Sequence, residues 1–134
     1  MPQMIFVNLP VSDVARAKAF YEGIGFTINP QFSDANANCV VISETIYLMT
    51  LHRDFFATFT AKPVGNPGSE TSVLLALSQE DRAAVDAMVA RALAAGGTEP
   101  RPAQDHGFMY QRTFADPDGH VFEPFWMDPG AVQG

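Results

Sequence analysis

Hydrophobic positions fall into short runs and helical stripes along the chain, and this succession occurs twice. The first run covers residues 4–9. Apolar residues then recur at helical spacing, at Val14, Ala17, Phe20, Tyr21 and Ile24. Ser12 is the expected N-cap of this helix, and Gly25 is expected to end it. The pattern therefore predicts a strand followed by an amphipathic helix.

The second half opens in the same way. An apolar run over residues 73–77 precedes a helical stripe that consists of Val85, Met88, Val89, Ala92 and Leu93. Ser78, with Asp81 three residues later, predicts a start of the capping-box type, and Gly96-Gly97 predicts the end. Shifting the chain by 68 positions aligns Phe6 with Leu74 and Asp13 with Asp81. This self-similarity indicates an internal repeat of one supersecondary unit.

Three strand-like segments follow each helix. The predicted strands cover residues 26–32, 38–43 and 45–51 in the first half, and 98–101, 108–114 and 120–127 in the second. Asp116-Pro117-Asp118-Gly119 predicts a type I turn that joins the last two strands as a hairpin. Residues 53–70 are predicted to be a connecting loop. The aromatic cluster that begins it, Phe55, Phe56 and Phe59, is expected either to cover a pocket as a lid or to fill a dimer interface.

Length and composition add further limits. With 134 residues, 47% of them hydrophobic, the chain is expected to be one domain over 1–134, with module one at 4–52, a loop at 53–70 and module two at 71–128. A net charge of −7 argues against nucleic acid as a partner. No segment resembles a signal peptide or a membrane span, and the single cysteine, Cys39, lies in an apolar run. We expect a cytoplasmic protein without membrane partners and with a buried, inert thiol.

The doubled strand–helix–three-strand order resembles the vicinal oxygen chelate superfamily, which comprises glyoxalases, bleomycin-resistance proteins and extradiol dioxygenases. Two motifs carry the resemblance: Asn8-Leu9-Pro10-Val11-Ser12-Asp13 before the first helix, and Asp116-Pro117-Asp118-Gly119-His120 before a strand that contains Glu123. Small bacterial proteins described as predicted lactoylglutathione lyases are the most similar in character. The resemblance implies an α+β fold in which two tandem βαβββ modules form a cup-shaped mixed sheet around the ligand, and it implies a homodimer.

The resemblance also implies where a metal would bind. Enzymes of this superfamily hold a divalent metal with one side chain from the first strand and one from the last strand of each module. In this chain those positions are Phe6, Leu48, Leu74 and Glu123. His, Gln or Glu would be expected there, because a catalytic metal needs about three protein donors and hydrocarbon offers none. We therefore predict no metal cofactor, with a divalent metal bound by other ligands as the alternative.

Strand alternation predicts the side chains that share the face of Glu123. The ligand-binding residues expected there are Phe6, Asn8, Leu48, Thr50, Leu74 and Phe125. Desolvation by apolar neighbours disfavours the charged form of a carboxylate, which would prepare Glu123 as a general base or acid with Asn8 as its hydrogen-bond partner. In the alternative interpretation Glu123 is simply satisfied by Asn8, Arg112 or water.

Neighbouring strand residues leave one question open. Trp126 lies on the opposite face from Glu123 and is expected to pack against a helix. Tyr110 and Arg112 share one face of their strand and Gln111 has the other, but strand alternation alone does not say which of the two faces is directed at the ligand.

Three functions are consistent with these residues. The first is a glyoxalase-like protein that binds a small organic molecule in an apolar pocket, with a degraded metal site and no assigned reaction. The second is a metal-dependent lyase or isomerase of the lactoylglutathione lyase type. The third is a metal-free enzyme that uses Glu123 as a general base. The missing metal donors favour the first, and the negative net charge favours it further if the ligand is cationic.

Overall fold

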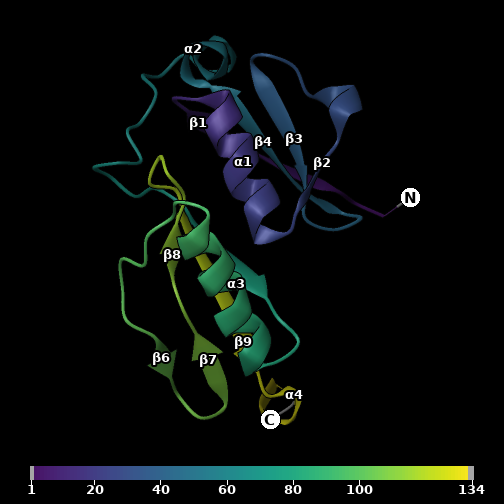
Figure 1. The fold of residues 1–134 in the computed structure, drawn as a ribbon, viewed down its shortest axis with the longest axis vertical. Helices are drawn as coiled ribbons and strands as arrows, with labels where there is room; N and C mark the ends of the chain where they lie inside the picture. The colour runs from purple at the N-terminus through teal and green to yellow at the C-terminus, as the bar shows by residue number, and fades with distance from the viewer. Residues whose placement is uncertain (1, 133–134) are drawn as a thin grey trace. The chain divides into compact units, whose positions relative to one another are not determined.

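The computed structural model describes residues 2–132 and contains the predicted doubled βαβββ order (Figure 1). The chain divides into two compact units, residues 1–66 and residues 67–134. Each unit has its own sheet and its own long helix. The predicted α+β class is therefore confirmed.

Unit one is a four-stranded sheet with the order β1-β4-β3-β2. Its elements are β1 (Ile5–Val11), α1 (Val14–Ile24), β2 (Thr27–Ile28), the 3-10 helix η1 (Pro30–Phe32), β3 (Ala37–Val41), β4 (Ile46–His52), α2 (Arg53–Phe56) and the 3-10 helix η2 (Ala57–Phe59). β1 and β4 pair in parallel, whereas β4, β3 and β2 pair antiparallel. The parallel pair requires a crossover, which α1 begins.

Unit two repeats this order with more broken strands. Its elements are β5 (Leu74–Ser78), α3 (Arg82–Ala94), β6 (Gln104–Asp105), β7 (Met109–Gln111), β8 (Phe114–Ala115), β9 (Val121–Met127) and α4 (Pro129–Val132). The sheet order is β5-β9-β7-β6, and β8 also pairs with β9. As in unit one, the first strand stands at the end of the sheet order and pairs in parallel with the last long strand.

Both long helices begin one to three residues later than the sequence analysis predicts. The N-caps are Asp13 and Asp81, whose carboxylates accept hydrogen bonds from the amides of Arg16 at 3.0 Å and Ala84 at 2.7 Å. Ser12 and Ser78 therefore do not cap. An aspartate at the N-cap accepts from the N3 amide as serine does, and its charge also favours the positive end of the helix dipole.

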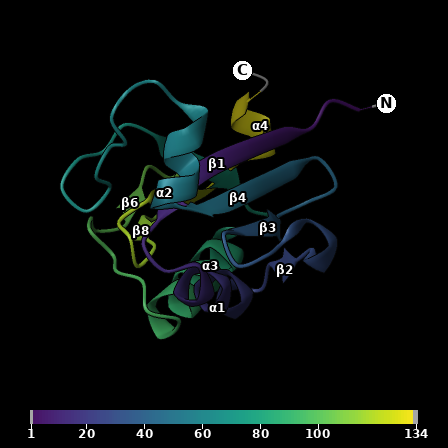
Figure 2. The same cartoon turned by 90° about the horizontal axis from the view of Figure 1, so that it is seen from above.

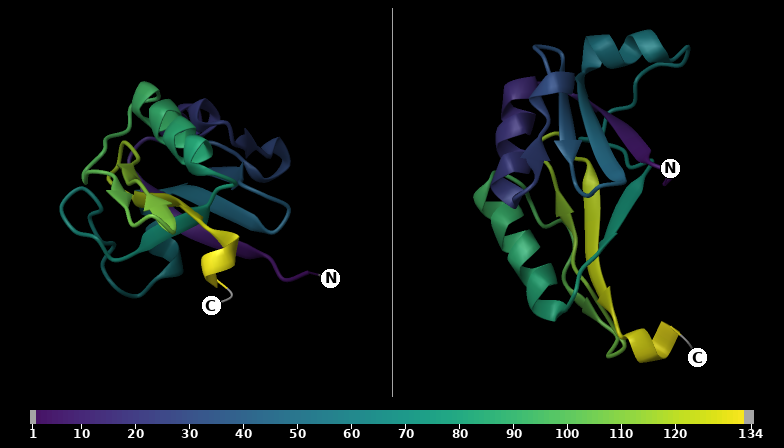
Figure 3. Two further views of the ribbon diagram at one scale, coloured as in Figure 1. Left: turned by 90° about the horizontal axis from the view of Figure 1, so that it is seen from below. Right: turned by 90° about the vertical axis from the view of Figure 1, so that its right-hand side faces the viewer.

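The helices cover one face of each sheet. In α1 the side chains of Ala17, Phe20, Tyr21 and Ile24 are buried against the unit-one sheet, and Figure 2 shows this helix running under β4 and β3. In α3 the buried residues are Val85, Met88, Val89 and Ala92, and this helix runs along β9 (Figure 3). Leu93, which was expected in that stripe, is 41% exposed. Cys39 is buried as predicted, and burial raises the pKa of its thiol.

Several weaker predictions are wrong. The strand expected at 26–32 ends at Ile28, because Pro30 starts η1 with Asn29 as its cap. The strand expected at 98–101 is a single bridge between Thr98 and Ala115. The strand expected at 108–114 breaks into β7 and β8. The loop expected from residue 53 begins with α2 and η2.

The hairpin before Glu123 forms as predicted. Asp116 Oδ1 accepts the backbone amides of Asp118, Gly119 and His120 at 3.0, 2.9 and 2.8 Å, and the amide of Gly119 also bonds the Asp116 carbonyl. Gly119 has a φ of 105°, which favours glycine. One carboxylate thus organises the whole turn and fixes the register of β8 on β9. Over residues 2–132, no helix has the length and apolar character that crossing a membrane would require.

Candidate functional site

The open face of the unit-two sheet, the one away from α3, carries Glu123. In the parallel pairing of β5 with β9, Leu74, Ala76 and Ser78 lie beside Val121, Glu123 and Phe125. Residues paired in this way project from the same face of a sheet. Leu74 and Phe125 therefore share the face of Glu123, and their role in ligand binding stays a prediction. Leu74 is 55% exposed, so this face has apolar side chains in contact with solvent.

Gln111 supplies the polar partner of Glu123. Its side-chain amide Nε2 donates to Glu123 Oε2 at 2.8 Å, from β7 on the same open face. Among residues 2–132, no donor bonds the second carboxylate oxygen, Oε1. Glu123 is half-buried, so this oxygen is an acceptor available to a bound molecule. The sequence analysis left the facing of Gln111 open; the structure places it with Glu123.

Arg112 lies on the opposite face and is not a partner of Glu123, contrary to one of the expected alternatives. Its guanidinium bonds both carboxylate oxygens of Glu99 at 2.9 Å and Asp86 of α3 at 3.0 Å. The Tyr110 hydroxyl donates to Asp86 at 2.6 Å. The pKa of Arg112 is raised, chiefly by Glu99, and the pKa of Asp86 is lowered, first by Tyr110 and then by Arg112.

Trp126 lies on this helix side too, as predicted. The Arg82 guanidinium of α3 stands 5.1 Å from the centre of the Trp126 ring and 5.2 Å from that of Tyr110. Arg82 also forms two hydrogen bonds with Asp105, at 2.6 and 3.0 Å. These bonds lower the pKa of the Asp105 carboxyl. This face of the sheet thus ties β6, β7 and β9 to the helix.

The open face of unit one differs from the prediction by one residue of register. Phe6 pairs with Tyr47 and Asn8 with Met49, and the rings of Phe6 and Tyr47 stack with centroids 4.5 Å apart. Phe6 and Asn8 therefore share a face with Tyr47 and Met49. Because side chains alternate, Leu48 belongs to the other face. Asn8 is exposed and donates to the Phe6 carbonyl at 3.3 Å.

Leu48 and Thr50 are core residues on the helix side, which corrects their expected place beside Phe6. Leu48 is 1% exposed and Thr50 is 0% exposed. The Thr50 hydroxyl accepts from the Asn38 amide at 2.9 Å, and that amide also donates to the Val14 carbonyl of α1 at 2.8 Å. These two bonds connect β3 and β4 to the first turn of the helix.

The residues at the implied metal positions do not fit a metal. With the corrected register, the last strand of module one offers Tyr47 or Met49 in place of Leu48, and Phe6, Leu74 and Met49 provide no hard oxygen or nitrogen donor. Only the Glu123 carboxylate is a strong donor, and Gln111 already occupies one of its oxygens. Within residues 2–132, no group of three or more His, Cys, Asp or Glu side chains could hold a metal ion.

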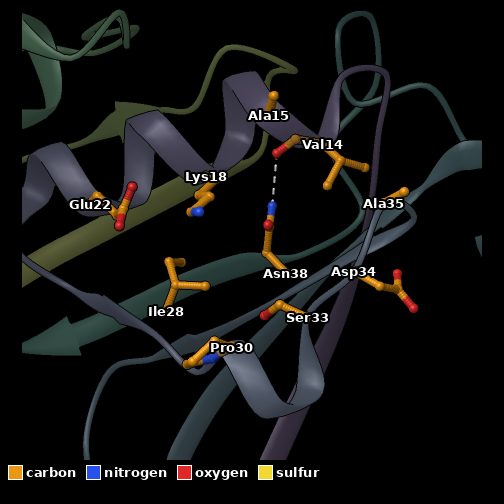
Figure 4. A pocket seen from close by; sticks show the side chains of 10 residues that line it. All are labelled: Val14, Ala15, Lys18, Glu22, Ile28, Pro30, Ser33, Asp34, Ala35 and Asn38. Carbon is orange, nitrogen blue, oxygen red and sulfur yellow. Dashed lines mark hydrogen bonds between the residues drawn. The ribbon is translucent and has the colours of Figure 1, made fainter.

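Each unit also has a hollow away from these open faces. In unit one a pocket of about 420 Å³ lies between α1 and the segment from β2 to β3, with Asn38 inside it (Figure 4). In unit two a shallow hollow of about 600 Å³ lies over the Arg112 network and the proline-rich segment 99–103. Sequence patterns did not indicate either of them.

Both predicted roles of the aromatic cluster, a pocket lid and a dimer interface, stay predictions. Phe55 and Phe59 are 36% and 69% exposed and meet edge to face with ring centroids 5.1 Å apart. They lie on α2 and η2, and α2 packs against β1 and β4 of its own unit. The Arg53 guanidinium ties this segment to the Val64 and Gly65 carbonyls.

Comparisons with known proteins find one family model over part of the chain and one fold over nearly all of it. The model of the bleomycin resistance protein-like N-terminal family matches residues 3–43. A glyoxalase-related enzyme from Fulvimarina pelagi has a similar structure, with a TM-score of 0.78, 25% identity, and coverage of 94% of this chain and 88% of that one. No curated protein sequence matches the chain significantly.

Two further structures are similar over nearly the whole chain. A glyoxalase/bleomycin resistance protein/dioxygenase family enzyme from Burkholderia phytofirmans has a TM-score of 0.76 and 21% identity, and covers 94% of this chain and 99% of its own. A bleomycin resistance determinant encoded on the transposon Tn5 has a TM-score of 0.65 and 19% identity, with coverage of 95% and 99%. The doubled βαβββ fold, the family model over residues 3–43 and these structures support the resemblance of the chain to the vicinal oxygen chelate superfamily.

Proposed function

We propose that this protein binds a small organic molecule that has an apolar body and a basic group, without metal chemistry. The observation that carries the proposal is the open face of the unit-two sheet. There the Glu123 carboxylate has one oxygen held by Gln111 and one oxygen without a protein donor among residues 2–132, beside the apolar side chains of Leu74 and Phe125.

The chemistry of this face favours a cationic ligand. A carboxylate oxygen is an acceptor only, and it bonds most strongly to a charged N–H group. Gln111 donates to one oxygen of the carboxylate and so restrains its orientation. Leu74 and Phe125 offer apolar surface to the remainder of the molecule, as ligand sites do where a few polar groups set the orientation. The net charge of −7 would attract such a cation over longer distances.

A matched pair of probes tests the proposal. 4-Phenylbutylamine and 4-phenylbutanol have the same apolar body and differ in the charged group. In an NMR titration the amine is expected to shift the side-chain amide signal of Gln111 and to bind more tightly than the alcohol. Because an exposed ion pair contributes up to about 1 kcal/mol, Glu123→Gln should weaken amine binding about fivefold and leave alcohol binding unchanged.

The control variant removes the same charge elsewhere in unit two. Glu80 is exposed just before α3, so Glu80→Gln should leave both affinities at the wild-type value. Equal binding of amine and alcohol, or an equal loss in the two variants, would contradict the proposed role of Glu123. Bleomycin is a second probe, because a bleomycin resistance determinant is among the similar structures.

A metal-dependent lyase of the glyoxalase type is the competing function, favoured by the fold alone. It requires donors that Phe6 and Leu74 do not have. Titration with Ni²⁺ or Zn²⁺, followed by calorimetry, should give no stoichiometric tight binding. Tight binding of one ion per chain that Glu123→Gln abolishes would revive the lyase and overturn the proposal.

A metal-free enzyme that uses Glu123 for proton transfer is the second alternative. The free Oε1 favours it, since a general base needs an oxygen that can reach the substrate. Mass spectrometry of protein purified from its native cells would identify a bound molecule. If that molecule is turned over by the wild type and not by Glu123→Gln, the protein is an enzyme and the binding proposal is incomplete.

A further inference from the structure

The pocket beneath α1 in unit one has the features of a second binding site. It lies between the helix and the β2–η1–β3 segment, on the helix side of the sheet and therefore on the other side from Phe6 and Asn8 (Figure 4). Its volume, about 420 Å³, is within the range of small-molecule sites. It is formed by residues of unit one alone, so it is separate from the open face around Glu123.

A buried amide lies in this pocket with an unused acceptor. Asn38 is only 2% exposed. Its nitrogen must face the Val14 carbonyl, which can only accept, and the same nitrogen donates to the Thr50 hydroxyl. The two N–H groups are thus used, and the orientation of the amide is fixed. Within the part of the chain that the structure describes, residues 2–132, no group donates to Asn38 Oδ1.

Asn38 Oδ1 is not among the fully buried side-chain atoms without a partner, so this oxygen is accessible from the pocket. A molecule in the pocket can therefore donate a hydrogen bond to it. The neighbouring Ser33 hydroxyl is already used, since it donates to the Asn29 carbonyl and accepts from the Cys39 amide. A ligand of this pocket therefore has to supply the hydrogen-bond donor itself.

The rim adds negative charge to this requirement. Lys18 and Glu22 lie on α1 at one side and Asp34 lies at the other, so two carboxylates oppose one lysine (Figure 4). All three residues are exposed. Val14 and Ile28 supply apolar wall between the rim and the amide.

We infer that this pocket binds a short aliphatic diamine. One ammonium group donates to Asn38 Oδ1, the hydrocarbon chain lies along Val14 and Ile28, and the second ammonium faces Glu22 and Asp34 at the rim. A neutral diol of equal length would offer a donor to Oδ1 and would lack attraction to the carboxylates. Lys18 opposes binding of the cation.

The experiment is an NMR titration of the full chain with 1,4-diaminobutane, and with 1,4-butanediol as the neutral match. The diamine is expected to shift the side-chain amide signals of Asn38 and the backbone amides of Ser33 and Asp34. The double variant Glu22→Gln/Asp34→Asn should weaken binding about fivefold, because exposed ion pairs contribute little each. Lys18→Gln should strengthen it.

A control separates a site from general attraction of cations to an acidic protein. Glu44 is an exposed carboxylate of unit one outside the pocket, and Glu44→Gln should leave the diamine affinity unchanged. The inference is overturned if the Asn38 signals do not move, if the diol moves them equally, or if Glu44→Gln weakens binding as much as the double variant. Since all signals read are from unit one, the outcome does not depend on binding at Glu123.

Discussion

Leu48→Ala tests the strand register on which the unit-one face depends. In the structure Leu48 is 1% exposed and points toward α1, so the substitution removes three buried carbons from the core. Leu-to-Ala changes at such sites cost about 2.7–5 kcal/mol, of which part is the cavity that remains. We expect a loss of about 3 kcal/mol. If Leu48 lined an open pocket beside Phe6 instead, the loss would be below about 1 kcal/mol.

Urea unfolding followed by far-UV circular dichroism measures the change. With a slope of about 2 kcal/mol/M, a loss of about 3 kcal/mol lowers the midpoint by about 1.5 M. Phe6→Ala is the matched comparison, because Phe6 is 45% exposed and its loss should shift the midpoint by less than half as much. Trp126, the only tryptophan of the sequence, reports separately on unit two. A larger effect at Phe6 than at Leu48 would refute the register.

Three further changes probe unit two. Arg112→Met leaves Glu99 without its bidentate partner, and the loss of charge-assisted bonds should lower the free energy of unfolding by about 2 kcal/mol in chemical denaturation. Gly119→Ala should cost about 2 kcal/mol or more, because φ is 105° and the new Cβ would meet the Pro67 carbonyl oxygen; a wild-type melting temperature would contradict this. The lowered folded-state pKa of Asp86 adds stability that is present above the unfolded value of about 3.9 and lost as pH falls through the folded value. When the pH is lowered below about 4, the free energy of unfolding of Asp86→Asn should therefore fall by less than that of the wild type. Equal losses of stability would exclude a contribution from the titration of Asp86.

The helices and the last hairpin could be predicted because their signals are local. The stripe of α1 has the helical period and ends at Gly25, and Asp116 and Gly119 occupy turn positions that few other residues fit. Pro30 was a visible reason to shorten the second predicted strand. The repeat placed Phe6 and Leu74 at equivalent positions, and both lie in the first strand of their unit as expected.

The faces of the strands were harder to predict for physical reasons. Residues 46–49 of β4 are apolar at every position, so no alternation of polar and apolar residues shows which side chains face the helix. Only the pairing of Phe6 with Tyr47 decides it, and pairing depends on contacts distant in sequence. The face on which Gln111 lies could not be predicted from local sequence either. It follows from the ion pairs of the next residue, Arg112, with Asp86 and Glu99 on the opposite side.

The capping aspartates of the two units occupy matching positions of the repeat and use the same bond to start each helix. Phe6 and Leu74, which also match, lie on solvent-exposed strand faces and carry little of the packing. The residues that start the helices and the residues that are available to a ligand therefore lie at different positions of the repeated unit. Such a division allows the side chains on the open strand faces to change while the start of each helix stays the same.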